Sequence, residues 1–167
     1  MDISSKKSGI GKDEFRAALS RFPSGVTIVT TKDASGRLHG ITVSAFASVS
    51  LEPPMILVCI EKTTGSHYAL SESEFFAVNI LSEEQEHLSN RFASQISDKF
   101  DTVDYRFGLG EVPVLSDALV ALECRLAYAH EGGDHTIFVG LVEKTEIKDD
   151  VNPLVYWHSN YRKLEAE

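Results

Sequence analysis

The sequence predicts a mainly β protein: one domain built as an antiparallel β-barrel with a few helices. Short segments rich in β-branched residues follow one another closely, only two segments have clear helical spacing, and these do not alternate with the strands as in a doubly wound sheet. A chain of 167 residues with 43% apolar composition can supply one core. We expect a flexible N-terminus at residues 1–11 and a single domain over 12–167.

The first predicted helix follows the polar N-terminus. Asp13 is the expected cap, because a short carboxylate accepts hydrogen bonds from the first free amides of a helix. Phe15, Ala18, Leu19 and Phe22 then follow the i, i+3, i+4, i+7 spacing of one apolar face.

The second predicted helix covers residues 82–93, where Ser82 and Gln85 have the spacing of a capping box. Residues 94–113, which follow it, have mixed polarity and no clear period, so we expect an irregular excursion there.

Six segments have the composition of strands. Two pairs of them are expected to form hairpins, one joined by the turn-forming residues 33–36 and the other by 131–134. In the fifth segment, apolar side chains alternate with Glu123 and Arg125, which are expected on the opposite face. The segments are residues 26–31, 37–46, 55–60, 75–81, 119–130 and 135–147.

Charge and motif content exclude several functions. A net charge of -9 disfavours binding to nucleic acid or to an anionic membrane, and no stretch approaches the roughly 20 apolar residues of a membrane span, so we expect a cytoplasmic protein. Cys59 and Cys124 lie in apolar runs and are expected to be core thiols in a reducing compartment. The chain has no GxGxxG after a strand and no GxSxG, and its six scattered histidines predict no metal site.

Hydroxyl groups are concentrated in residues 40–54. Thr42, Ser44, Ser48 and Ser50 could hold a phosphate or the polar edge of a flat heterocycle. The alternative is a serine-rich strand end whose hydroxyls bond to the local backbone.

A second polar cluster follows the next strand. Lys62, Thr63, Thr64 and Ser66 would give the same phosphate a cation and further hydroxyls, although such a cluster is also typical of a simple turn.

The stretch GGDHTIFVG, residues 132–140, places a histidine where a strand begins. Gly132 and Gly133 allow positive φ, and Asp134 could orient the imidazole of His135. A hydrogen-bonded turn without a function is the alternative.

Five segments in register resemble the flavin reductase family with the FMN-binding split-barrel fold. This family comprises the small reductase partners of two-component flavin-dependent monooxygenases. The resemblance extends from about residue 13 to 164, and it is carried by residues 22–31, 40–60, 75–93, 132–143 and 153–164.

The resemblance implies an antiparallel Greek-key barrel that binds FMN or FAD and takes hydride from NADH, possibly NADPH. It also implies a homodimer and a partner monooxygenase supplied through diffusible reduced flavin. His135 is implied as the catalytic position, a positioning and electrostatic residue for the nicotinamide. The implied cofactor-binding residues are Thr42, Ser44, Ala45, Ser48, Ser50, Lys62, Ser66, Arg91, Phe92, Gly133, Asp134 and Tyr161.

The C-terminal segment departs from the family pattern, which has a glycine or two before Tyr161 and Arg162. This chain has His158, Ser159 and Asn160 there, a difference that affects packing on the nicotinamide side. Two other functions stay open: a non-catalytic flavin-binding or electron-carrier protein, and an enzyme like the pyridoxine-phosphate oxidases.

Overall fold

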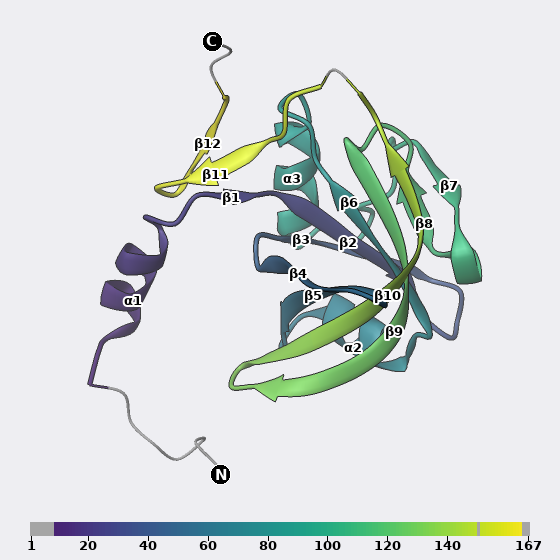
Figure 1. Cartoon of the computed structure of the whole chain (residues 1–167), viewed down its shortest axis with the longest axis horizontal. Coiled ribbons are helices and arrows are strands. Elements are labelled where there is room, and N and C mark those ends of the chain that lie inside the picture. The colour runs from purple at the N-terminus through teal and green to yellow at the C-terminus, as the bar shows by residue number, and fades with distance from the viewer. Residues whose placement is uncertain (1–8, 150, 165–167) are drawn as a thin grey trace.

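The computed structural model describes residues 9–149 and 151–164, and its largest feature is a curled sheet of seven antiparallel strands (Figure 1). Strand order is β3-β2-β6-β9-β10-β5-β4. The strands are β2 (Thr27–Lys32), β3 (Leu38–Val43), β4 (Phe46–Leu51), β5 (Pro54–Glu61), β6 (Phe75–Ile80), β9 (Val120–Gly132) and β10 (His135–Ile147). Both predicted hairpins are confirmed, as β2–β3 and β9–β10.

The sheet must close on itself because of one short connection. β3 and β4 stand at opposite ends of the strand order, yet only Ser44 and Ala45 separate them in sequence. Three Cα steps reach about 11 Å at most, so the two edges of the sheet must meet. Within the described chain β3 and β4 are not paired, and the barrel is split at this seam. The fold is thus the predicted antiparallel barrel, but the single strand expected over 37–46 is wrong, because the chain changes edge at Ser44 and Ala45.

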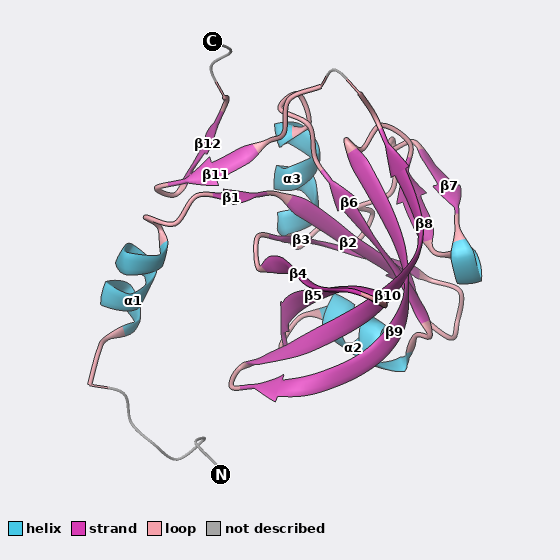
Figure 2. Ribbon diagram, in the orientation of Figure 1, coloured by secondary structure: helices cyan, strands magenta, loops and turns pink. Residues whose placement is uncertain are grey.

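Smaller elements surround the barrel, as Figure 2 shows. β1 (Ser24–Gly25), β11 (Val155–Trp157) and β12 (Asn160–Arg162) form a second sheet, and α2 (Gly65–Glu72) connects β5 to β6. α3 (Glu86–Ala93) packs on the barrel, whereas α1 (Lys12–Leu19) stands apart from it (Figure 1). None of the described helices is long and apolar enough to cross a membrane.

The core has two main parts. Inside the barrel, Phe76 and Phe138 are fully buried with the valines and isoleucines of β2, β5 and β6. A second cluster joins the fully buried Phe92 of α3 to the barrel. Of the two thiols expected in the core, Cys124 is buried there and its burial raises the pKa of the thiol to about 12, whereas Cys59 is only half-buried, so the expectation is wrong for Cys59.

Both predicted helix starts need correction. α1 has Gly11 at its cap with no side-chain hydrogen bond, so Asp13 lies inside the first turn, where a carboxylate still interacts favourably with the helix dipole. None of the residues of α1 is buried. The expected flexible segment 1–11 falls mostly outside the described residues.

α3 begins at Glu86, four residues later than predicted. Gln85 Oε1 accepts a hydrogen bond from the amide of Ser82 at 2.9 Å, as in a capping box, but Gln85 itself occupies the cap position. Its Nε2 donates to the carbonyl of Asp117 at 2.8 Å, so the side chain also ties the helix to the chain before β9.

The excursion over 94–113 is more ordered than predicted. It contains β7 (Tyr105–Phe107), the short helix η1 (Leu109–Glu111) and the start of β8 (Pro113–Leu115). It covers Glu123, which is 2% exposed and accepts hydrogen bonds from Arg106 Nη1 at 2.9 Å and from the amide of Leu109 at 2.7 Å. Burial raises the pKa of Glu123, but these two hydrogen bonds, with the positive charges of Arg106 and Lys144, outweigh burial, so the net pKa is lowered.

Candidate functional site

A cavity of about 200 Å³ opens at the barrel seam, between β3, β5 and the start of β10. It brings Thr42, Ser44 and Ala45 together with His135, about ninety residues away in the sequence. Ligand-sized pockets usually hold ~300 to 1,000 Å³, so this cavity suits part of a larger ligand. Its lining is Ile41, Thr42, Val43, Ser44, Ala45, Cys59, Ile60, Glu61, Thr64 and His135.

The seam shapes one wall of this cavity. Ser44 and Ala45 are exposed, and the carbonyl of Ala45 accepts a hydrogen bond from the amide of Cys59 at 3.0 Å, which fixes the link against β5. Thr42 Oγ1 donates to the carbonyl of Ser89 at 2.6 Å and so connects β3 to α3. The wall is a short stretch of backbone with hydroxyls, held from two sides.

The turn of the β9–β10 hairpin presents His135 at the mouth of the cavity. Gly132 pairs with His135, and Gly133 has a φ of 74°, a conformation that favours glycine. His135 Nδ1 lies 2.7 Å from Asp134 Oδ1, and the hydrogen bond from His135, followed by its charge, lowers the pKa of Asp134. Because the carboxylate of Asp134 can only accept, Nδ1 carries the proton of this contact, and Nε2 is left without a contact to Asp134. The two side chains are thus in contact, and the role of Asp134 in orienting His135 stays a prediction.

Lys62 does not stand free beside the cavity. Its Nζ donates to the carbonyl of Gly133 at 2.8 Å and forms an ion pair with Glu131. Both partners lie at the end of the β9–β10 hairpin, so this ammonium contacts the turn that carries His135.

Arg91 and Phe92 lie away from the cavity. The ring of Phe92 is fully buried beneath Gly40, where an added Cβ would lie 2.5 Å from the ring. The guanidinium of Arg91 donates to the carbonyls of residues 98, 99 and 101 at 2.6 to 2.7 Å and thereby holds that loop. A fully buried ring cannot touch a ligand in this structure, and the hydrogen bonds of Arg91 go to the loop and not to the cavity lining.

The remaining predicted residues do not line the cavity. Ser48 is exposed on β4, Ser50 is half-buried beyond a bulge in that strand, and Ser66 is half-buried in the first turn of α2. The hydroxyl of Tyr161 lies 2.7 Å from Ser89 Oγ.

Five lining residues were not predicted as site residues; they are Ile41, Val43, Cys59, Ile60 and Glu61. Thr64 also lines the cavity, and it caps α2: its Oγ1 accepts from the amide of His67 and donates to the carbonyl of Glu61. Thr64 belongs to the polar cluster that the sequence indicated, whereas Cys59 and Glu61 resemble ordinary strand residues in the sequence.

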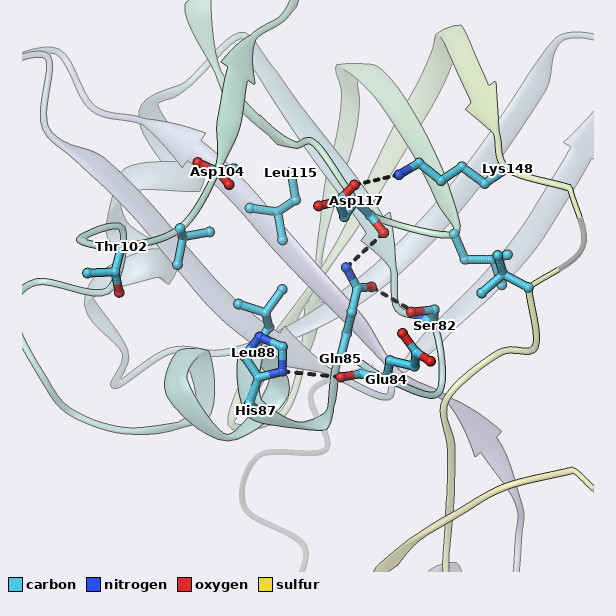
Figure 3. A pocket seen from close by; sticks show the side chains of 13 residues that line it. Ser82, Glu84, Gln85, His87, Leu88, Thr102, Asp104, Leu115, Asp117 and Lys148 are labelled. Carbon is cyan, nitrogen blue, oxygen red and sulfur yellow. Dashed lines mark hydrogen bonds and ion pairs between the residues drawn. The ribbon is translucent and has the colours of Figure 1, made fainter.

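A larger cavity of about 410 Å³ lies at the other end of the β9–β10 hairpin (Figure 3). None of the predicted site residues lines it. Its polar groups bond to one another: Lys148 Nζ pairs with Asp117 Oδ1 at 2.7 Å, and Gln85 links Ser82 to Asp117. We therefore place the site at the smaller cavity, where His135 and the seam meet. Among the described residues, no group of three or more His, Cys, Asp or Glu side chains could hold a metal ion.

Known proteins resemble this chain over most of its length. Residues 19–165 match the model of the flavin reductase like domain. A "Probable flavin reductase" of Rhizobium meliloti (strain 1021) is 40% identical over 87% of this chain, but the chain spans only 47% of that relative. The reductase subunit HsaB of a flavin-dependent monooxygenase of Rhodococcus jostii (strain RHA1) is 38% identical over 92% of this chain and 78% of its own length.

A solved structure extends this similarity to the fold. The NADH:FAD oxidoreductase SgcE6 of Streptomyces globisporus C-1027, in complex with NAD and FAD fragments, superposes with a TM-score of 0.87 at 32% identity. The match covers 99% of this chain and 96% of that one.

Proposed function

The chain belongs to the flavin reductase like family, and on this premise we propose that it is an NADH-dependent flavin reductase. In this reaction a hydride passes from C4 of the reduced nicotinamide to N5 of FMN or FAD. The observation that supports the proposal most strongly is the cavity that joins the seam residues Thr42, Ser44 and Ala45 to His135. Hydride transfer needs two rings held with their reacting atoms about 3 to 3.5 Å apart. A cavity with polar groups on two sides can hold one ring against each side.

The lining of the cavity suits the edge of a flat heterocycle. Ile41 and Ile60 offer apolar surface, while the backbone of Ser44 and Ala45 and the hydroxyl of Thr64 offer polar groups. We assign the ring edge of the flavin to this seam. For the flavin phosphate we retain the hydroxyls of Ser48, Ser50 and Ser66 as proposed contacts, although these side chains do not line the cavity.

We assign the nicotinamide to the His135 side of the cavity. Asp134 holds the ring through Nδ1, so Nε2 can accept a hydrogen bond from the carboxamide of the nicotinamide. His135 then positions the substrate and adjusts its electrostatic surroundings. The hydride step itself requires no proton from this residue.

A second copy of the chain is the proposed cover for the open side of the site. The cavity is too small to enclose a flavin together with a nicotinamide. The helix α1 stands apart from the barrel with its apolar side chains half-exposed, Phe15 at 51% and Leu19 at 57%. We propose a homodimer, which light scattering tests directly.

The reduced flavin is proposed to leave and serve a partner flavin-dependent monooxygenase, as the similarity to a monooxygenase reductase subunit suggests. The test is NADH oxidation by purified protein with and without added flavin. Oxidation that depends on added flavin supports a reductase with a diffusible product. If the purified protein contains bound flavin and oxidises NADH without added flavin, the result would instead indicate an electron carrier with tightly bound flavin.

A further inference from the structure

Lys62 is a cation placed directly against the turn that presents His135. We propose that Lys62 is a positioning residue, which holds the turn formed by Gly133 and Asp134 and, through it, His135 at the mouth of the cavity. Its role for the nicotinamide rests on the proposed function. The contacts that support the role are independent of that function.

Three contacts join Lys62 to the hairpin. Its amide donates to the carbonyl of Asp134 at 3.0 Å, its Nζ donates to the carbonyl of Gly133 at 2.8 Å, and the same Nζ pairs with Glu131. These partners lie on both sides of the positive-φ residue Gly133. The backbone amide and the side chain of Lys62 together therefore bridge the two arms of the turn.

Strand register explains why the turn needs this support. His135 is the first residue of β10 and pairs with Glu61, the last residue of β5. The two residues of the turn therefore project past the end of β5, and Lys62 follows Glu61 directly. The pairing of β5 with β10 ends where the turn begins, and Lys62 extends the hydrogen bonding between these two segments by one residue.

The bond to the carbonyl of Gly133 should contribute more than the ion pair. Hydrogen bonds with a charged partner are stronger than neutral ones, whereas pairs with an exposed carboxylate contribute little. Glu131 is 82% exposed at its side chain, and the Lys62 side chain is 35% exposed. We therefore expect amide exchange in the turn and the Michaelis constant for NADH to change about five- to tenfold when the ammonium is removed. This effect is smaller than for a buried hydrogen bond of the same type.

Hydrogen–deuterium exchange of the protein without cofactor tests the contact. In Lys62→Met, exchange of the amides at 132–136 should become about five- to tenfold faster, and Lys62→Arg, which keeps a charged donor, should restore most of the protection. Lys32→Met is the matched control, because Lys32 forms a similar ion pair with Glu111 on another part of the barrel. It should leave exchange at 132–136 unchanged.

Steady-state kinetics test the consequence for the nicotinamide. Lys62→Met should raise the Michaelis constant for NADH about five- to tenfold, change turnover less than about twofold, and do so equally with FMN and with riboflavin. A loss confined to FMN, with unchanged exchange and unchanged NADH kinetics, would show that Lys62 binds the flavin phosphate and would overturn the proposal. If the wild-type protein oxidises no NADH, the proposed function fails, and the exchange result alone decides whether Lys62 holds the turn.

Discussion

Replacing His135 by alanine isolates the contribution of the imidazole to nicotinamide binding. The side chain is 40% exposed, and its recorded partner is the exposed Asp134, so its removal should change the free energy of unfolding by less than about 0.5 kcal/mol. What is lost is the one hydrogen bond that Nε2 accepts from the carboxamide and the packing of the ring on the substrate. Together these are worth ~1.4 to 2.8 kcal/mol, or about ten- to a hundredfold in kcat/KM for NADH.

The assay is steady-state NADH oxidation at saturating flavin, with flavin affinity measured separately by fluorescence titration. His130→Ala is the control, because His130 lies on the same hairpin but stacks on Tyr128 outside the cavity, with ring centroids 5.9 Å apart. We expect a large loss for His135→Ala, little change for His130→Ala, and nearly intact flavin affinity in both. Unchanged NADH kinetics in His135→Ala would show that this residue does not bind the nicotinamide.

Three further predictions concern stability and phosphate recognition. Replacing the buried Glu123 by glutamine should cost about 1 to 3 kcal/mol near neutral pH by urea unfolding. The pKa of Glu123 is lowered in the folded state, so its carboxylate stabilises the fold above the unfolded-state pKa, and this contribution is lost as the pH falls through the folded-state pKa. The stability of the variant should therefore fall less on acidification than that of the wild-type protein. An equal pH dependence in both proteins would contradict a stabilising role of the Glu123 carboxylate. Gly40→Ala should lower stability by about 1 to 3 kcal/mol, since the new Cβ meets the Phe92 ring, and an unchanged melting temperature would argue against this packing. The double variant Ser48→Ala, Ser66→Ala should weaken the binding of FMN and FAD more than that of riboflavin in fluorescence titrations. Equal losses of affinity for all three flavins would show that these hydroxyls do not contact the phosphate.

The sequence predicted those parts of the fold that depend on residues close together in the chain. Both hairpins follow from alternating apolar residues on either side of a turn composition, and the Asp134–His135 contact joins neighbours in sequence. These features need no knowledge of distant segments, so a single sequence suffices for them.

Features that depend on distant segments could not be predicted. The break at Ser44 arises because the sheet closes there, which no local pattern records. The burial of Glu123 depends on Arg106 and on the irregular chain around Leu109. Likewise, Lys62 looks like a free cation in the sequence, and only the fold brings the carbonyl of Gly133 within 2.8 Å of it.

The central claim is that this chain reduces flavin with NADH at the seam cavity. The most direct test follows the near-ultraviolet absorbance of NADH after mixing with purified protein, with FMN, FAD, riboflavin or no flavin added. We expect catalytic loss of NADH that requires added flavin, and the order of the three flavins will show which one the site prefers. Absence of NADH oxidation with every flavin would contradict the proposed function and leave only the fold.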